Sequence, residues 1–249
     1  MAASEIKLRC PMSWRDRPFM GLDFESTGIS VETERIVTGC LGLASPQGWV
    51  PRNWLLTQSE PIPQAATDVH GITTEYANEH GMDPATALQQ LVDDLYKGWS
   101  MGLPVVGYNI VFDLTILDRN LRRLDLAPLE VAGPVIDPLV IDKAVDPYRR
   151  GSRKLIDVCA HYGITLTDED AHGAEPDARA ACRLAWKLGG HPTIGQKTLE
   201  DLHSWQALAY AEQRASFAAY LAKQGNALDD DNRVWPLKPL ASAVREPAA

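Results

Sequence analysis

Clustered cysteines are missing from this sequence of 249 residues. The four cysteines, Cys10, Cys40, Cys159 and Cys182, are scattered, with no CxxC pair and no clustering with histidines. This distribution excludes a disulfide framework and a zinc site of the usual spacing. Because free thiols are typical of a reducing compartment, we expect a cytoplasmic protein.

Long apolar runs and a signal-peptide pattern are also missing. No stretch approaches the roughly 20 apolar residues that span a bilayer, so we expect no membrane partner. A surplus of positive charge is missing too, since the net charge is −9. That charge argues against a broad basic surface for nucleic acid, but it is compatible with an acidic pocket balanced by bound metal ions.

Two local groups of basic residues stand out against the acidic background. Arg119, Arg122 and Arg123 fall on a predicted helix, which favours a solvated face. A second basic group lies at the start of another predicted helix, and we interpret its members as candidate phosphate contacts: Arg149, Arg150, Arg153 and Lys154.

Alternating apolar residues predict three strands between residues 18 and 56, and their short connections predict an antiparallel meander. Pro51 confines the third strand to a sheet edge or a bulge. Further strands are predicted over 104–108 and 134–141, and a loop over 69–73. Helical periodicity or capping residues predict helices that start at Asp83, Asn109, Ser152, Pro176 and Thr198.

The resulting fold class is α/β, with a mixed sheet of about five strands flanked by helices. We expect an N-terminal arm over 1–17 and one domain over 18–190. A Gly/Pro break then precedes a C-terminal helix and an irregular tail over 191–249.

Two carboxylates lie close together on the first predicted strand. Alternate residues of a strand point to one face, so Asp23 and Glu25 project side by side, while Phe24 points the other way. Such a pair repels itself unless a cation lies between the two groups, and a divalent metal that prefers oxygen ligands serves well. Alone, the pair is also compatible with a solvated strand end of no function.

Other acids are predicted at the starts of two helices. Asp113 lies one turn after Asn109, beyond the end of the fourth strand, and Asp177 lies in the first turn of a later helix. Acids in a first turn commonly just complement the helix dipole. His172 lies in the loop before Asp177, where a surface histidine is an equally ordinary interpretation.

Three motifs in combination indicate a protein family more specifically than any one of them does alone. Asp23-x-Glu25, Asn109-x-x-Phe112-Asp113 and His172-x4-Asp177 occur in this order. Together they resemble the DnaQ-like, or DEDDh, family of 3′→5′ exonucleases over about residues 18–190. Further stretches fit the family pattern: 26–28, 69–73, 107–109, 137–139 and 155–163.

The resemblance implies a ribonuclease-H-like fold and a metal-dependent exonuclease that releases nucleoside 5′-monophosphates from 3′ ends, with single-stranded DNA favoured. It implies two divalent ions, Mg²⁺ with Mn²⁺ as a substitute. Asp23 would be shared by both ions, Glu25 and Asp177 would complete one, and Asp113 would support the other. His172 would be the general base.

The resemblance also implies contacts between the protein and the end of the strand. The substrate-binding residues would be Phe24, Thr27, His70, Asn109 and Phe112. An aromatic ring at Phe112 suits sequence-tolerant stacking on bases.

Several alternatives stay open at this point. The chain could be a proofreading subunit of a DNA polymerase, an exonuclease for short RNA, or a non-catalytic nucleic-acid-binding module. The C-terminal helix with Trp205, Phe217 and Tyr220 could dock a polymerase or a second copy of the chain, or it could simply pack on the domain.

Overall fold

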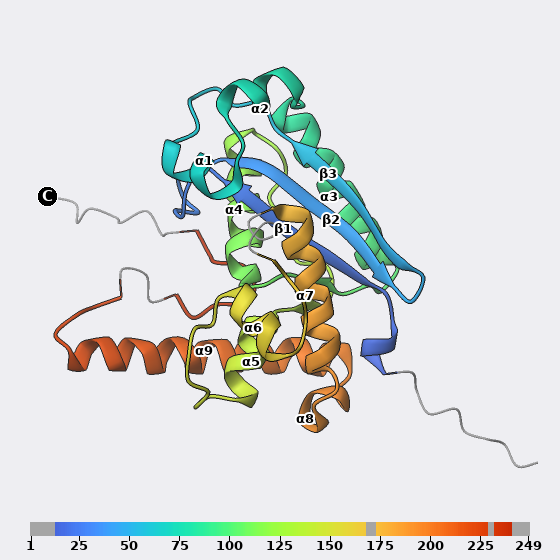
Figure 1. The fold of residues 1–249 in the computed structure, drawn as a ribbon, viewed down its shortest axis with the longest axis vertical. Coiled ribbons are helices and arrows are strands. Elements are labelled where there is room, and N and C mark those ends of the chain that lie inside the picture. The colour runs from blue at the N-terminus through green and yellow to red at the C-terminus, as the bar shows by residue number, and fades with distance from the viewer. Residues whose placement is uncertain (1–12, 168–172, 229–231, 241–249) are drawn as a thin grey trace, which may run out of the picture.

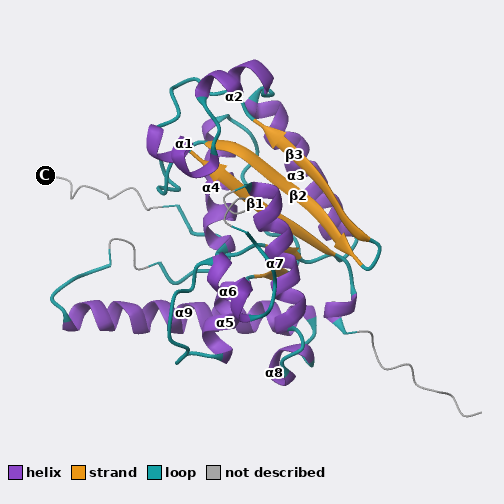
Figure 2. Ribbon diagram, viewed as in Figure 1, coloured by secondary structure: helices purple, strands orange, loops and turns teal. Residues whose placement is uncertain are grey.

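A five-stranded mixed sheet forms the centre of the molecule (Figure 1, Figure 2). The computed structural model describes residues 13–167, 173–228 and 232–240. The strands, in the order β3-β2-β1-β4-β5, are β3 (Gly48–Leu55), β2 (Ile36–Ser45), β1 (Phe19–Ser26), β4 (Val105–Val106) and β5 (Val135–Ile136). β1, β2 and β3 pair antiparallel, whereas β1, β4 and β5 pair parallel. The predicted mixed sheet, its meander and the edge position of Pro51 are confirmed.

Helices cover both faces of this sheet. α3 (Pro84–Ser100) and α4 (Ile110–Arg123) pack on one face, and α7 (Ala174–Leu188) crosses the other face in front of β1 and β2 (Figure 1). α5 (Pro138–Val145) and α6 (Leu155–His161) lie on the side of α7. The flanking helices predicted from the sequence are therefore confirmed as the two outer layers.

Residues of the central strand β1 alternate between these two layers. Met20, Leu22 and Phe24 are buried in the core formed with α3 and α4. Gly21 faces the other way, since a Cβ there would lie 2.8 Å from the Ala178 carbonyl oxygen and 2.8 Å from Cys182 Sγ of α7. Only glycine permits so close an approach, and it brings the start of α7 down onto the face that carries the acids of β1.

The loop predicted over 69–73 covers only residues 71–73, between two short helices. α1 (Gln64–His70) ends at Gly71, which has a left-handed φ of 75°, and α2 (Thr74–His80) begins after Thr73, whose side chain accepts the Tyr76 N–H at 3.2 Å. The prediction was wrong for Val69 and His70. Helices of two turns carry too little periodicity to be recognised from the sequence.

The fifth strand is much shorter than predicted. β5 ends at Ile136, and the rest of the predicted stretch forms α5, because the Asp137 carboxylate caps the helix by accepting the Leu139 N–H at 2.9 Å. Pro138 suits the first helical position. An apolar run of this length fits a strand or a buried helix equally well, and the aspartate–proline pair decides between them.

Two predicted helix starts also need correction. Ser152 is not the cap of α6, which begins at Leu155 after Lys154; the Ser152 hydroxyl instead accepts the Lys154 N–H at 3.1 Å. α7 begins two residues before Pro176, whose missing N–H costs nothing in a first turn. The starts predicted at Asp83 and Thr198 are confirmed by their side-chain caps.

The C-terminal segment is partly integrated with the sheet. After the short α8 (Pro192–Gly195), α9 (Leu199–Lys223) packs its first half against the body, and its second half projects beyond it (Figure 1). The buried Gln206 side chain accepts the Asp137 N–H at 2.6 Å and donates to the Val135 carbonyl at 3.0 Å. These bonds tie α9 to the end of β5.

The two ends of the described chain are anchored by side chains. Trp14, in the 3-10 helix η1 (Trp14–Asp16), donates from Nε1 to the Ile194 carbonyl at 3.2 Å. In the tail, the Lys238 N–H donates to Thr115 Oγ1 at 3.2 Å. Among the residues described, no helix combines the length and apolar character needed to cross a bilayer.

Candidate active site

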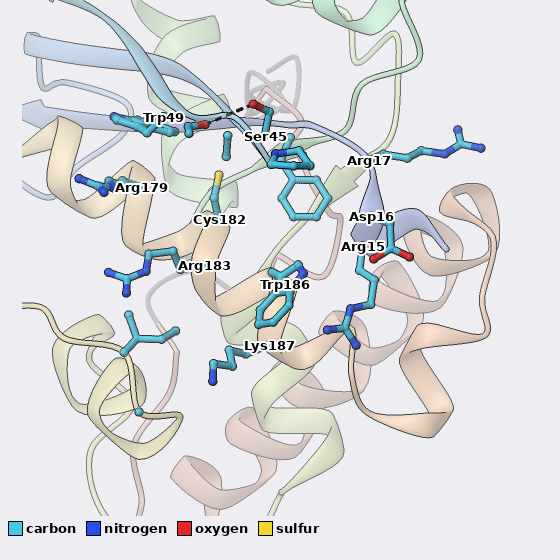
Figure 3. A pocket seen from close by; sticks show the side chains of 16 residues that line it. Arg15, Asp16, Arg17, Ser45, Trp49, Arg179, Cys182, Arg183, Trp186 and Lys187 are labelled. Carbon is cyan, nitrogen blue, oxygen red and sulfur yellow. Dashed lines mark hydrogen bonds between the residues drawn. The ribbon is translucent and has the colours of Figure 1, made fainter. Parts of the chain in front are cut away.

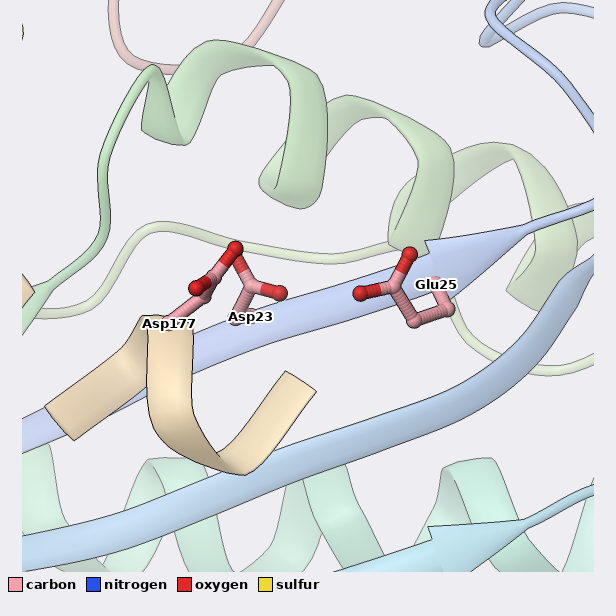
Figure 4. A group of neighbouring side chains, drawn as sticks. All are labelled: Asp23, Glu25 and Asp177. Carbon is pink, nitrogen blue, oxygen red and sulfur yellow. The ribbon is translucent and has the colours of Figure 1, made fainter. Parts of the chain in front are cut away.

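Three carboxylates converge between β1 and the start of α7 (Figure 4). Asp23 and Glu25 project from alternate positions of β1, and Asp177 projects from the first turn of α7. One oxygen of each carboxylate lies within 4.8 Å of the others. Oxygen donors so close together form a set that suits a hard divalent cation.

A fourth carboxylate, Asp113, reaches the same place from α4. Its side chain is 3% exposed, and Oδ1 accepts the Phe24 N–H at 3.2 Å. Repulsion from Asp113 contributes to the raised pKa of Asp23, so the two groups lie near enough to interact. Asp113 therefore lies beside the group of Asp23, Glu25 and Asp177.

A fifth carboxylate, that of Asp137, holds the start of α4 in place. Its two carboxylate oxygens accept the N–H groups of Asn109 and Ile110 at 3.0 and 3.1 Å. Asn109 occupies the capping position, in the left-handed region with φ 63°, but its own side chain makes no capping bond. The prediction of Asn109 as a side-chain cap was wrong, because the Asp137 carboxylate, just after β5, accepts the first N–H groups of α4 instead. By fixing the start of α4, Asp137 also positions Asp113.

Burial and mutual repulsion raise the proton affinity of the acids. Burial is the first cause of the raised pKa of Asp23, followed by repulsion from Asp113, Glu25 and Asp177. Burial and then Asp177 raise the pKa of Glu25 to about 7. Burial also raises the pKa of Asp113, against the opposing effect of its bond from the Phe24 N–H.

These observations fit a divalent metal. Carboxylates that are buried together without a cation resist ionisation, and a metal ion removes that penalty by neutralising them. The donor set of Asp23, Glu25, Asp113 and Asp177 is all oxygen, as Mg²⁺ and Mn²⁺ prefer. The acidic cluster predicted from the sequence is thus consistent with divalent metals.

Two of the predicted substrate-binding side chains are occupied within the protein. The Phe24 ring is 5% exposed and packs in the core against Gly39, so only its backbone faces the acids. The buried Thr27 hydroxyl donates to Glu34 Oε2 at 2.5 Å and accepts the Arg35 N–H at 2.9 Å. Both residues shape the end of β1 in this structure.

His70 lies at the end of α1, beside the end of β1. Its Nδ1 accepts the Ile72 N–H at 3.1 Å. Burial lowers the pKa of His70, and the Ser26 backbone partly offsets this effect. The ring therefore favours its neutral form at neutral pH.

Asn109 and Phe112 line one pocket of about 350 Å³. Ile29 and Val31 of the β1–β2 loop and Val111 line it as well. Its other wall comes from the C-terminal segment: Tyr210 and Arg214 of α9, Leu228 and Lys238. The sequence offered no signal for this wall, because it lies outside the segment that carries the motifs.

The basic groups noted in the sequence are largely engaged in ion pairs. Arg119 is buried and pairs with Asp118 at 2.6 Å and Glu32 at 2.8 Å, so its prediction as part of a solvated face was wrong. Arg149 and Arg153 both pair with the buried Asp142. His172 lies outside the described residues.

The fold and the carboxylate cluster define the class as a ribonuclease-H-like exonuclease fold with a candidate metal site. A family model described as an exonuclease, RNase T, matches residues 20–185. The chain therefore belongs to the RNase T exonuclease family, and the resemblance to DnaQ-like exonucleases is confirmed.

Two curated relatives carry names of DNA polymerase III. The chain is 25% identical over 221 residues to a PolC-type DNA polymerase III of Lacticaseibacillus paracasei, covering 86% of this chain and 14% of that protein. It is 32% identical over 148 residues to a DNA polymerase III subunit epsilon-like protein of Rhodobacter capsulatus, covering 57% of this chain and 20% of that protein. The chain thus spans a fifth or less of these relatives' lengths.

Solved structures of exonuclease I share the fold. One matches with a TM-score of 0.61 at 16% identity and covers 81% of this chain and 45% of its own. The complex of Escherichia coli exonuclease I with a dT13 oligonucleotide matches with a TM-score of 0.58 at 17% identity, again over 81% of this chain and 45% of its own. At these identities the likeness concerns the fold alone.

Proposed function

We propose that this protein is a metal-dependent 3′→5′ exonuclease that releases nucleoside 5′-monophosphates from single-stranded 3′ ends, with DNA favoured over RNA. The observation that carries the proposal is the convergence of Asp23, Glu25 and Asp177, joined by Asp113, at one point between β1, α4 and α7. Family membership supports the same reaction class.

The four carboxylates would hold divalent metal ions, Mg²⁺ with Mn²⁺ as a substitute. When bound, such ions supply positive charge against the charge that develops on the reacting phosphate, and they lower the pKa of the attacking water. Asp113 is held by the Phe24 N–H, and its helix start is held by Asp137, so this ligand is fixed before substrate arrives.

His172 is our candidate general base. It precedes Asp177 by five positions in the sequence (177 − 172), which supports a location near the acids. A neutral imidazole would accept the proton of the attacking water, so activity should rise with pH through the pKa of His172.

The last nucleotides of the strand would occupy the pocket of Asn109 and Phe112. The half-buried Phe112 ring offers a stacking surface, and stacking of bases on aromatic rings is tolerant of sequence. Arg214 and Lys238, on the opposite wall, would attract phosphates. The solved fold relative in complex with dT13 supports single-stranded DNA as the favoured substrate.

A panel of 5′-labelled strands tests the proposal. Single-stranded DNA, duplex DNA, duplexes with mismatched 3′ ends and short RNA are incubated with Mg²⁺, with and without a chelator. We expect chelator-sensitive shortening from the 3′ end, fastest on single-stranded DNA, and loss of turnover in Asp113→Asn with an unchanged fold. Shortening of RNA alone would assign the substrate differently, and no shortening by folded wild-type protein would contradict the enzyme assignment in favour of a binding module.

A proofreading role beside a polymerase is a second candidate, favoured by the names of both curated relatives. The projecting half of α9 exposes Phe217 and Tyr220, 48% and 56% exposed, with their rings stacked at 6.5 Å. This surface would be the contact with a polymerase or with a second copy of the chain. Preferential removal of mismatched 3′ ends in the panel would support this role, and equal rates on matched and mismatched ends would contradict it.

A further inference from the structure

A pocket of about 600 Å³ lies apart from the carboxylates, between α7, the β2–β3 hairpin and η1 (Figure 3). We call it the basic pocket, because five cationic residues line it: Arg15, Arg17, Arg179, Arg183 and Lys187. Asp16 is the single acidic residue of its lining. This volume falls in the range of pockets that bind small molecules or parts of larger ones.

The positive charge of the basic pocket contrasts with the rest of the chain. The whole sequence has 24 basic and 33 acidic residues. Elsewhere in the described chain, six arginines form ion pairs with carboxylates: Arg35, Arg52, Arg119, Arg122, Arg149 and Arg153. None of the five cations of the basic pocket forms such a pair with any residue that the structure describes.

Their hydrogen bonds leave this charge largely uncompensated. Within the part of the chain that the structure describes, Arg183 donates to a neutral partner alone, the Thr165 carbonyl, at 3.5 Å. The Nε of Arg15 is buried and has no hydrogen-bond partner among the described residues. Five cations against one carboxylate in the same hollow create a positive potential that attracts an anionic ligand.

An exposed aromatic ring lies among these cations. Trp186 is 45% exposed, the Arg15 guanidinium carbon lies 4.6 Å from its ring centroid, and Lys187 Nζ lies 5.9 Å from it. Trp49 lines the pocket from the hairpin, with its Nε1 donating to Glu175 Oε1 at 3.3 Å. Inorganic anions need no such ring, whereas a nucleotide combines a flat base for Trp186 with a phosphate for the cations.

The basic pocket and the acid cluster share helix α7. Asp177 lies in its first turn, and Lys187 lies ten residues further on (187 − 177), which corresponds to a rise of about 15 Å. Arg179 is two positions after Asp177 and so points to the opposite side of the helix. The pocket is therefore a separate site, within a few nucleotides' reach of the carboxylates.

We infer that the basic pocket is a second binding site for single-stranded nucleic acid, which holds phosphates and a base of the substrate strand away from the 3′ end that reaches the carboxylates. This inference deepens the proposed function and rests on it for the identity of the strand. An acidic segment of another protein is the competing ligand for a basic and aromatic pocket, and the test below separates the two.

The test compares two double variants of equal charge change. Arg183→Gln/Lys187→Gln removes two cations of the pocket, and Lys97→Gln/Lys223→Gln removes two exposed cations elsewhere. Binding of a labelled 20-nucleotide strand is measured against salt in a chelator, which prevents turnover. For single strands, each phosphate contact makes the plot of log K against log salt steeper by about 0.7. The pocket variant, which loses two cations, should therefore have a slope that is smaller in magnitude by about 1.4 than that of the wild-type protein. The control variant should keep the wild-type slope. Trp186→Ala should weaken binding roughly tenfold.

Turnover of a dinucleotide, which is too short to reach the pocket, should be unchanged in all three variants and shows that they fold. Equal salt slopes in both double variants would overturn the inference. A glutamate-rich peptide that binds wild-type protein more tightly than the strand, and loses binding in the pocket variant, would overturn it in favour of a protein partner. Binding is measured without turnover, so a wild-type protein that binds the strand but releases no nucleotide would contradict the proposed function alone.

Discussion

The buried Asp142 and the half-buried pair Asp23 and Glu25 have opposite surroundings in this molecule. Asp142 is fully buried, and it accepts from Arg149, Arg153 and the Tyr162 hydroxyl. Asp23 and Glu25 instead face other carboxylates, which raise the pKa of each beyond the effect of burial. The same residue type stabilises the fold where arginines surround it and opposes folding where acids surround it.

The difference indicates that the acidic cluster is kept for a function, at the expense of the stability of the fold. A buried acid that serves only the structure is paired, because an unpaired charge in the interior costs several kcal/mol. The cluster of Asp23, Glu25, Asp113 and Asp177 accepts that cost in the metal-free protein. Such a departure from local consistency is expected at sites that bind an external charge.

The largest expected effect comes from removing a charge from the cluster. Asp23→Asn should lower kcat/KM by about 1000-fold or more, which corresponds to roughly 4 kcal/mol of transition-state stabilisation. The same change should raise the stability of the metal-free protein, on the order of 1 kcal/mol, because it removes a repelling charge. Steady-state kinetics and thermal unfolding in a chelator measure both effects.

Asp93→Asn is the matched control, since Asp93 is exposed on α3 and far in sequence from the cluster. It should leave both the rate and the melting temperature unchanged. A lowered melting temperature for Asp23→Asn would contradict the idea that the cluster is strained without metal.

The next effect in size concerns the paired acid. Asp142→Asn leaves Arg149 and Arg153 beside a neutral group and should cost about 3 to 5 kcal/mol of the free energy of unfolding. For a chain of this size that lowers Tm by roughly 10 °C. The rate of the protein that remains folded should hardly change. Differential scanning calorimetry measures the Tm of Asp142→Asn, with the exposed Asp157→Asn as the control. An unchanged Tm for Asp142→Asn would show that stability does not depend on the ion pairs of Asp142.

A smaller effect is the pH dependence that the cluster imposes. The pKa of Glu25 rises from its ordinary 4.5 to about 7 in the folded protein. The folded state therefore binds more protons than the unfolded state between pH 4.5 and 7, and the stability of the metal-free protein falls as the pH rises through that window. Metal affinity should change in the opposite direction, since only the ionised carboxylate binds a cation well.

Urea unfolding in a chelator at several pH values measures this slope, and titration with Mn²⁺ measures the affinity. Glu25→Gln should flatten the stability profile in this window. A metal-free wild-type protein that gains stability between pH 5 and 7 would mean that other groups outweigh Glu25.

Sequence reasoning predicted one side of this comparison and missed the other. The alternation of β1 and the helical signals near 109 and 176 are local, and they assigned the acids to elements that the structure brings together, although α7 begins two residues before Pro176 and Asn109 makes no side-chain cap. Asp142 is paired with Arg149 and Arg153, and Arg119 is paired with Glu32 as well as with the adjacent Asp118. A sequence without structure gives no indication of the pairs that join separate segments. Arg119 was accordingly interpreted as solvated, although it is buried between Asp118 and Glu32.

Local signals also failed where two interpretations had equal support. The apolar stretch around Asp137 fits a strand or a helix, and the structure divides it between β5 and α5. The wall of the Asn109 and Phe112 pocket could not be predicted, because Arg214 and Lys238 are brought there by the packing of α9 and the tail. The catalytic role of His172 stays a prediction.

The smallest expected effect sharpens the comparison at an exposed pair. Glu32 is half exposed, with 49% of its side chain accessible, and Arg119 keeps Asp118 and the carbonyls of Lys238 and Pro239 if Glu32 is neutralised. Glu32→Gln should therefore cost only about 0.5 kcal/mol, a shift of roughly 1–2 °C in Tm. The loss should shrink further at high salt, whereas the loss from Asp142→Asn should not, because a buried pair is poorly screened. If Glu32→Gln instead lowered the free energy of unfolding by several kcal/mol independently of salt, the Glu32–Arg119 pair would behave like the buried pairs of Asp142. Arg119 would then require both of its carboxylate partners for stability.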